Sequence, residues 1–271
     1  MCIRDRFLRF AEEFMPRAIL IENVPGLVSF ERGRTLAAII SSLEEYGYHI
    51  SVKIMSAAYH GVPQTRWRTI IVGTLNSHDE DSFWPQPTHY AQVRANFSHN
   101  FQGKDILEKP ADATAPLATT LYDAISDLPL SPSPFNAQST IAQYNSPASS
   151  VFQQQVRADS TGVYNHFSSN LSGINLERLS HIPPGGNWTN IPHSLLPAGM
   201  QRARKSDHTK RYGRPRWSDL SGTILTKCDP HWGAFFHPSA DRVFTVREAA
   251  RIQSFPDTYH FTGALADQYA E

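Results

Sequence analysis

The sequence predicts an α/β protein in which part of a doubly wound, open sheet is followed by a smaller irregular module. Three observations support this fold class. Helical and strand-like patterns alternate over residues 1–76, which is typical of an α/β sheet domain. After Asn76 the chain becomes rich in Pro, Ser, Asn and Gln, while recurring aromatic residues argue against disorder. Ordered patterns return near the C-terminus.

The first helix and strand follow from hydrophobic spacing. Within residues 7–15, apolar side chains recur at i, i+3, i+4 and i+7 from Phe7, which predicts an amphipathic helix that Pro16 ends. The continuous apolar run 18–21 predicts a strand buried on both faces. The chain thus begins with a helix that leads into a buried strand.

A second helix and two further strands complete the predicted sheet piece. Residues 35–46 place their aliphatic side chains on one helical face, and Gly47 is the expected C-terminal stop. Residues 48–55 and 69–74 are the predicted strands. Later elements are shorter, at 121–128, 172–182 and the strand-like 223–226.

A capping box is predicted near the C-terminus. The Thr245 side chain can accept from the Glu248 backbone N–H, while the Glu248 carboxylate reaches back to the start of the turn. A short helix is expected over 247–254.

The composition is that of a neutral globular protein. The 271 residues include 25 Lys+Arg and 25 Asp+Glu, so binding to an acidic polymer requires local clusters of charge. Two cysteines cannot form a disulfide framework, and the histidines lack zinc-ligand spacing, so we expect no metal site. No apolar run reaches membrane-spanning length and no secretory signal opens the chain, so a cytoplasmic location is expected.

Three groups of polar residues could carry chemistry. Glu22 and Asn23 follow the first strand, where ligands bind in doubly wound sheets, although a lone Glu-Asn pair is commonly only the polar start of a loop. Arg66 and Arg68 share one face if extended and follow Gln64, although two solvated arginines on a surface strand are the alternative.

The third group is a basic segment, residues 202–216, with seven Lys/Arg and one acidic residue. A solvated basic loop is the alternative to a phosphate-contacting segment. The residues expected to contact DNA are Arg202, Arg204, Lys205, Lys210, Arg211 and Arg214.

These segments resemble the DNA cytosine-5 methyltransferases. Ile21-Glu22-Asn23-Val24-Pro25-Gly26-Leu27 resembles the family's ENV block, and Gln64-Thr65-Arg66-Trp67-Arg68 resembles its QxRxR block. Residues 220–225 and 242–256 resemble the ninth block, which organises target recognition. The resemblance implies a partial doubly wound (Rossmann-like) methyltransferase sheet with a smaller irregular target-recognition domain.

The resemblance also implies a division of the chain and a set of roles. Residues 1–76 would be the C-terminal part of the catalytic domain, 77–263 the target-recognition domain including the ninth block, and 264–271 the start of the return to the catalytic domain. The turn Pro183-Pro184-Gly185-Gly186-Asn187-Trp188 would shape a loop near DNA. Arg247, Glu248 and Arg251 are expected to be structural.

The implied reaction transfers a methyl group from S-adenosylmethionine to C5 of a cytosine flipped out of duplex DNA. Glu22 would hydrogen-bond the cytosine N3 and exocyclic amine, a role that calls for a closed pocket. Arg68 would contact the flipped cytosine and the attacking thiolate, and Arg66 would help to position the active-site loop. Asn23 and Gln64 would support them.

Parts of that chemistry have no counterpart in the sequence. Attack at cytosine C6 needs a thiolate from a Pro-Cys pair upstream of the ENV block. Cys2 has no preceding proline and Cys228 lies far downstream, so we expect no nucleophile in this chain. The Gly-rich loop that approaches S-adenosylmethionine and the family's last block are also missing.

We therefore expect the C-terminal portion of an enzyme, inactive alone. The incomplete sheet should expose an apolar edge and two uncovered faces. A non-catalytic DNA-binding subunit of a split or degenerate methyltransferase, completed by a polypeptide with the missing blocks, is the alternative. An RNA-methylating relative is a third interpretation, against which the long recognition insert favours duplex DNA.

Overall fold

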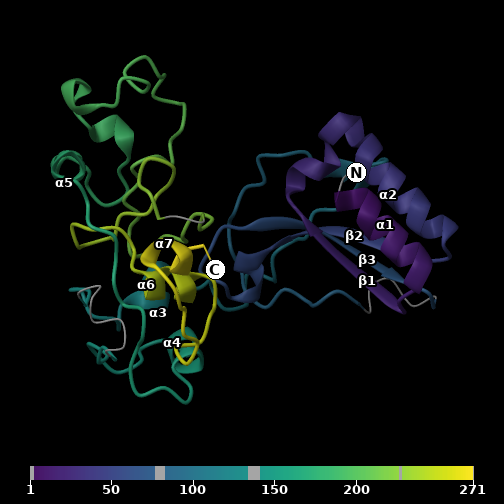
Figure 1. The fold of residues 1–271 in the computed structure, drawn as a ribbon, viewed down its shortest axis with the longest axis horizontal. Coiled ribbons are helices and arrows are strands. Elements are labelled where there is room, and N and C mark those ends of the chain that lie inside the picture. Colours follow the sequence, from purple (N-terminus) through teal and green to yellow (C-terminus); the bar gives the residue numbers. More distant parts are fainter. Residues whose placement is uncertain (1–2, 77–82, 134–140, 226–227, 271) are drawn as a thin grey trace. The chain divides into compact units, whose positions relative to one another are not determined.

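The computed structural model describes residues 3–76, 83–133, 141–225 and 228–270. The chain divides into two compact units (Figure 1). Unit 1 comprises Met1–His60 and Arg66–Leu117, and unit 2 comprises Gly61–Thr65 and Ala118–Glu271. Among the described residues, no helix combines the length and the apolar character needed to span a bilayer.

Unit 1 contains the predicted helices and strands of the sheet piece, with ends within two residues of those expected except that the first helix begins at Ile3, four residues before the predicted start. Its longer elements are α1 (Ile3–Phe14), β1 (Ala18–Asn23), α2 (Arg34–Glu45), β2 (His49–Ser56) and β3 (Trp67–Thr74). Its shorter elements are β4 (Asn100–Phe101), β5 (Lys104–Asp105) and the 3₁₀ turns Pro25–Val28, Phe30–Gly33 and Ala57–His60. Gly47 follows α2 with a φ of +90°, which confirms it as the helix stop.

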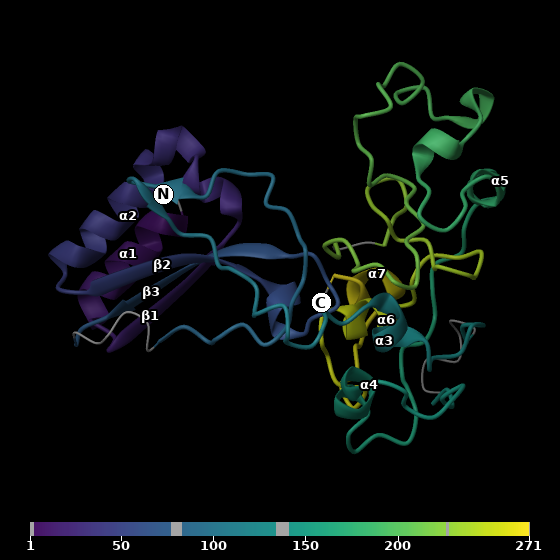
Figure 2. The same ribbon diagram turned by 180° about the vertical axis from the view of Figure 1, so that it is seen from behind.

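The sheet has the strand order β1-β3-β2, and β3 is antiparallel to both neighbours. The two outer strands therefore run parallel to each other, with α2 in the connection between them. This is an α/β crossover with an antiparallel strand inserted between its two strands, which agrees with the predicted piece of an α/β sheet. Helices α1 and α2 lie side by side along one face of the sheet (Figures 1 and 2).

Side chains alternate between the two faces of this sheet. Ile19, Ile54 and Ile71 are buried on the helix-covered face, where α2 buries its own Leu36 and Leu43. Leu20 points to the opposite face and is 70% exposed. The expectation that residues 18–21 are buried on both faces is therefore wrong, because only one face is covered by helices.

The segment after β3 covers part of that second face. The Trp84 indole donates to Ser51 Oγ (3.0 Å) on β2. The same segment also pairs with the outer edge of β2, where Ile54 donates its N–H to Ile106 (2.8 Å) and accepts from Glu108 (2.9 Å). Unit 1 consequently extends past Asn76 to Leu117, and the prediction of two uncovered faces is wrong.

The apolar face of α1 is only partly used. Ala11 is buried, whereas Phe10 and Phe14 are 53% and 63% exposed and lie 4.6 Å apart between ring centroids. Phe10 and Phe14 thus form an apolar surface on α1, while Leu20 is exposed separately on the opposite face of the sheet. The predicted amphipathic helix is present, but much of its apolar face lies in solvent in this chain.

Unit 2 has short helices joined by long irregular connections. Its helices are α3 (Leu121–Ile125), α4 (Val151–Val156), α5 (Gly173–Ser180), α6 (Val246–Ile252) and α7 (Leu265–Gln268), with 3₁₀ turns at Trp188–Asn190 and His193–Leu195. Buried side chains from many parts of the unit form a large core, including Leu121, Ile125, Phe236, Phe244 and Ile252, and a smaller cluster lies around Phe167 and Phe261. No strand forms over 223–225, and Thr226 lies outside the described residues.

The pentapeptide 61–65 belongs to unit 2 because it pairs with the chain at Ser221. Thr65 donates its N–H to the Ser221 carbonyl (2.8 Å), and Ser221 donates to Pro63 (3.0 Å). Thr223 Oγ1 adds a bond to the Thr65 carbonyl (3.1 Å). Paired backbone therefore holds this stretch, although 156 residues separate Thr65 from Ser221.

Candidate active site and nucleic-acid interface

Glu22, Arg66 and Arg68 meet at one end of the sheet. Arg68 donates from Nε to Glu22 Oε1 (2.5 Å), and Arg66 Nη2 lies 3.8 Å from the same oxygen. Arg68 also donates from Nη1 to the Trp67 carbonyl (2.7 Å), which fixes the plane of its guanidinium. The structure thus brings together all three residues expected to be catalytic.

Strand register explains this convergence. Glu22 stands opposite Ile70 in the β1–β3 ladder, so Arg68, two residues before Ile70, is its diagonal neighbour on the same face. Arg66 is two residues further along. Because the end of β1 pairs with the start of β3, Glu22 near the end of one strand lies beside Arg68 at the start of the other.

The site of Glu22 is open. The Glu22 side chain is 52% exposed, compared with 21% for Arg68 and 32% for Arg66. Partial burial, and then the adjacent Arg68 charge, lower the pKa of Arg66 from its ordinary value, while Glu22 acts in the opposite direction. The closed pocket expected around the carboxylate is not formed by unit 1 alone.

Asn23 and Gln64, the two expected supporting residues, have different surroundings. Asn23 accepts the Val24 N–H (2.8 Å) on its Oδ1, which shapes the turn after β1. Gln64 belongs to unit 2 and is buried, and both polar atoms of its amide lack a hydrogen-bond partner among the described residues. Leaving a buried amide unpaired lowers the stability of the fold by about 1–3 kcal/mol. The Gln64 amide can therefore gain from hydrogen bonds to a further polar partner.

The described cysteine is unsuited to nucleophilic attack. Cys228 lies in the core of unit 2, where burial raises the pKa of its thiol and the Glu248 charge adds to the effect. Cys2 lies outside the described residues. Among the described residues, no group of three or more His, Cys, Asp or Glu side chains could hold a metal ion.

The basic segment of unit 2 is largely solvent-exposed. Arg202, Lys205 and Lys210 are exposed. The Arg204 side chain is 85% exposed and pairs with Asp207 (3.2 Å). This is the environment in which cations can reach phosphates with little loss of internal contacts.

Arg214 differs from these residues. Its Nε donates to the His237 and Pro238 carbonyls (3.2 Å each), and its Nη2 lies 3.2 Å from Asp241 Oδ1. Its side chain is largely buried. The guanidinium is therefore bonded within unit 2, unlike the exposed cations with which it was expected to contact DNA.

The turn over 183–188 anchors this segment. Gly185 donates to the Arg214 carbonyl and Trp188 donates to the Arg211 carbonyl (3.1 Å). The buried Trp188 indole donates to the Asp207 carbonyl (3.0 Å). Gly185 has a φ of +84° and lies against the Arg216 guanidinium, so a side chain there would collide with it. The turn holds the basic segment in a defined path.

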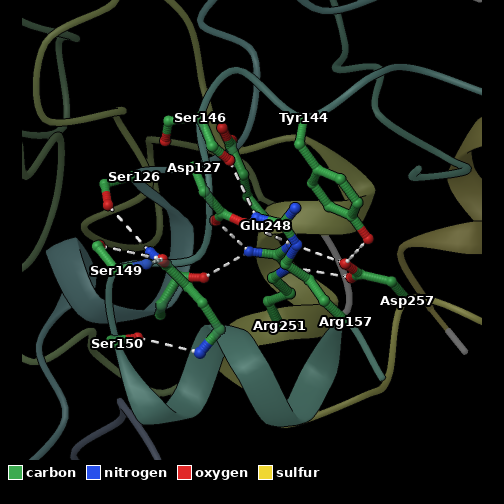
Figure 3. Close-up of polar contacts among 12 residues, drawn as sticks. Ser126, Asp127, Tyr144, Ser146, Ser149, Ser150, Arg157, Glu248, Arg251 and Asp257 are labelled. Carbon is green, nitrogen blue, oxygen red and sulfur yellow. Dashed lines mark hydrogen bonds and ion pairs between the residues drawn. The ribbon is translucent and has the colours of Figure 1, made fainter. Parts of the chain in front are cut away.

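Arg251, on α6, lies at the centre of a buried ion network (Figure 3). Its guanidinium contacts Asp127 (2.5 Å) and Asp257 (2.6 Å), and all three side chains are fully buried. Arg157 adds a second cation on Asp127 (3.1 Å), and the Tyr144 hydroxyl donates to Asp257 (2.7 Å). This satisfied network ties the connections of unit 2 to α6.

Arg247 and Glu248 also have structural surroundings. Arg242 makes a two-pronged contact with Glu248 (2.7 Å to each oxygen), and Glu248 closes the predicted capping box with Thr245. Burial alone would raise the pKa of Glu248, but the Arg242 charge lowers it to about 2. Arg247 donates to the Tyr164 and Pro256 carbonyls (2.9 and 3.0 Å).

Sequence reasoning missed one polar cluster near the sheet. Glu108 is buried, accepts the Ser56 N–H (2.9 Å), and lies 2.9 Å from His60 Nε2. It fastens the 84–112 segment to the end of β2. The sequence offers no local signal for this contact, because 48 residues separate Glu108 from His60.

Comparison with known sequences gives a consistent result. Residues 6–271 match the family model described as C-5 cytosine-specific DNA methylase. DNA (cytosine-5)-methyltransferase 1A of Oryza sativa subsp. japonica is 34% identical over 98% of this chain and 18% of the relative. Type II methyltransferase M.AgeI of Thalassovita gelatinovora is 31% identical over 98% of this chain and 71% of the relative.

A solved structure supports the fold. A protein described as a DNA modification methyltransferase encoded within an E. coli prophage aligns with 97% of this chain and 67% of its own, with a TM-score of 0.55 and 18% identity. The chain thus spans 18% of the length of the rice relative, 71% of M.AgeI and 67% of this structure.

Proposed function

The chain belongs to the family of C-5 cytosine-specific DNA methylases, and on that basis we propose that it is the C-terminal portion of a DNA cytosine-5 methyltransferase. The complete enzyme transfers a methyl group from S-adenosylmethionine to C5 of a cytosine flipped out of duplex DNA. The observation that carries this proposal is the convergence of Arg68 and Arg66 on Glu22 at the end of the sheet.

In this proposal, Glu22 hydrogen-bonds the cytosine N3 and exocyclic amine and makes the ring more electrophilic at C6. Arg68 holds the Glu22 carboxylate and contacts the ring, and Arg66 positions the active-site loop. Asn23 and Gln64 support these groups. Since Glu22 is half exposed here, the closed pocket has to be completed by bound DNA and by residues beyond unit 1.

We propose that, of the expected recognition residues 77–263, those from Ala118 on carry target recognition, because the chain up to Leu117 belongs with the sheet. Residues 1–76 belong to the catalytic part, and residues 264–271 begin the return to it. DNA phosphates are contacted by the exposed cations Arg202, Arg204, Lys205 and Lys210 and by the half-buried Arg211. Arg214 supports the segment from inside unit 2, because its guanidinium is bonded to carbonyls there. Salt dependence of duplex binding measures this contribution.

The chain alone does not supply the nucleophile. Cys228 is buried with a raised thiol pKa, and no Pro-Cys pair occurs in the 271 residues. We therefore propose that the isolated chain binds duplex DNA without methylating it. Detectable methyl transfer by the purified chain would contradict this.

S-adenosylmethionine is the methyl donor implied by the family, and the described residues do not fit it. The groove of unit 1, about 670 Å³, is lined by Lys53, Trp84 and the 104–112 segment and by no glycine. The end of β1 is occupied by the Glu22–Arg68 pair. The cofactor would have to be held by residues outside those described.

A second candidate function follows from the apolar surface of Phe10 and Phe14 on α1. In a split enzyme, a separate polypeptide with the Gly-rich loop and the Pro-Cys pair would supply the missing chemistry and cover this surface. A degenerate remnant would instead bind DNA only. The two differ in whether an added polypeptide restores methylation.

The test mixes the chain with a polypeptide that carries the cofactor loop and Pro-Cys pair of a relative, and follows labelled methyl transfer to duplex DNA. Glu22→Gln should lower the transfer rate by about 10²-fold or more, as expected for loss of a proton-transferring group. The matched control is Glu44→Gln, an exposed carboxylate on α2. Full activity of Glu22→Gln in the restored enzyme would refute the assignment.

A further inference from the structure

We propose that Trp232 and Arg211 form a stacking platform for an unstacked base of the bound DNA. This inference rests on the proposed function, because that function makes DNA the ligand of unit 2. It adds a site for a nucleobase to the phosphate contacts of the basic segment. The ligand class is the π-face of a base that has lost a stacking neighbour.

Exposure sets Trp232 apart. Its side chain is 59% exposed, whereas Trp67, Trp84 and Trp188 are buried at 9% or less. The Arg211 guanidinium lies over the indole, 4.8 Å from the ring centroid. An exposed indole beside a planar cation is a surface on which any base can stack, because every base has a π-face.

Hydrogen bonds and a close glycine contact restrain the loop that carries Trp232. Trp232 donates its N–H to the Asp229 carbonyl (3.0 Å), and His231 donates its N–H to Asp229 Oδ1 (2.9 Å). Tyr212 donates to the Pro230 carbonyl (2.6 Å), which joins the loop to the basic segment. Gly233 lies against the Phe235 ring, so a side chain there would collide. Little ordering is needed before a ligand binds.

Further aromatic and basic side chains contact the Trp232–Arg211 platform and the residues next to it. The His231 ring stands edge-on to Trp232 (4.9 Å between centroids) and lies 3.2 Å from the buried Tyr212 hydroxyl. Arg178 lies over Tyr212 (5.6 Å). Partial burial, and then the Arg211 charge, lower the pKa of His231 from its ordinary value.

Charge favours a nucleic acid over a protein as the occupant. Arg211 is continuous with Lys210 and the exposed cations at 202–205. Asp229 is the acidic residue of the loop, and its Oδ1 already accepts a backbone N–H. A polyanion that brings phosphates to the cations can therefore bring a base to the indole.

The experiment measures binding of the full chain to two fluorescently labelled duplexes, one intact and one with a central abasic gap. The gap leaves neighbouring bases with a free face. The variants are W232A, W232F, L176A and K205A. Leu176, on α5 and 45% exposed, controls for loss of an exposed apolar side chain, and Lys205 controls for loss of charge. Intrinsic fluorescence is recorded in parallel, because Trp232 is the tryptophan most open to quenching by a stacked base.

We expect W232A to weaken binding to the gapped duplex about tenfold, the effect of losing one base–aromatic stack. W232F should restore most of this loss, L176A should have no effect, and K205A should weaken both duplexes equally and reduce the salt slope by about one. Quenching of the wild-type chain should disappear in W232F.

Equal affinities of W232A and wild type for the gapped duplex would overturn the platform and leave the proposed function intact. The platform is also overturned if W232A weakens both duplexes by one factor, because an indole that reads unstacked bases must distinguish them. A wild-type chain that binds neither duplex would overturn the proposed function and the platform together.

Discussion

Replacement of Arg251 by methionine should cause a large loss of stability in unit 2. The guanidinium is fully buried between two fully buried carboxylates, Asp127 and Asp257. Burial alone would lower the pKa of Arg251, but its bonds to the two carboxylates raise it above its ordinary value. Removing the cation leaves two buried negative charges without their central partner.

The contacts that remain set the expected magnitude. Breaking a buried ion pair by removing one partner costs about 3–5 kcal/mol. Asp127 keeps Arg157 (3.1 Å), and Asp257 keeps the Tyr144 hydroxyl (2.7 Å) and Arg247 (3.8 Å). These partners place the loss at the lower end, about 3 kcal/mol, still a large share of the roughly 5–15 kcal/mol that stabilises a domain.

Urea unfolding followed by far-ultraviolet circular dichroism and tryptophan fluorescence measures this loss. The matched control is Arg204→Met, since Arg204 is 85% exposed and pairs with Asp207 on the surface. Exposed pairs contribute about 0–1 kcal/mol, so the control should remain close to wild type. Comparable losses in the two variants, or a loss under about 1 kcal/mol for Arg251→Met, would refute the reasoning.

Three further predictions concern local features. Thr245→Ala removes the cap of α6 and should destabilise unit 2 by about 1 kcal/mol in the same urea assay, whereas an unchanged midpoint would contradict the capping box. Burial lowers the pKa of His237 from 6.5 to about 4, although Glu248 opposes the shift. The unfolded chain therefore takes up a proton that the folded unit does not, and stability present above pH 6.5 should be lost as the pH falls towards 4. The pH slope of the unfolding free energy should be shallower in His237→Gln, and equal slopes would exclude His237 as the cause. The isolated chain should be marginally soluble because Phe10 and Phe14 are exposed, and Phe10→Ser with Phe14→Ser should raise its solubility limit. A highly soluble wild-type monomer that melts cooperatively would show the expectation to be mistaken.

Local sequence patterns predicted the longer elements of unit 1, and the family resemblance implied that Glu22 and Arg68 act on the same base. Strand periodicity determines which face each residue occupies, and Glu22 and Arg68 lie beside the ends of two apolar runs. Gly47 and the Thr245 capping box were predictable for the same reason, since their bonds span few residues. The α/β fold class is confirmed by these elements and by the prophage structure.

Long-range contacts were beyond sequence reasoning. Leu20 is as apolar in sequence as its buried neighbours. It is exposed because the 84–112 segment covers only part of the sheet face on which it lies. Asp127 is 124 residues from Arg251, and a lone aspartate gives no sign of such a partner. Arg214 looks like the other cations of its segment, but carbonyls elsewhere in unit 2 take up its donors.

The placement of Gly61–Thr65 in unit 2 has a consequence for modularity. The chain leaves the first unit, contributes five residues to the second, returns, and crosses again after Leu117. Unit 2 is therefore not a contiguous cassette. A recognition module exchanged between homologues by cutting at residue 76 would lose the Thr65–Ser221 pairing and would strip the 84–112 cover from the sheet. Grafts that move 61–65 together with 118–271, and leave 66–117 with the sheet, keep each compact unit intact.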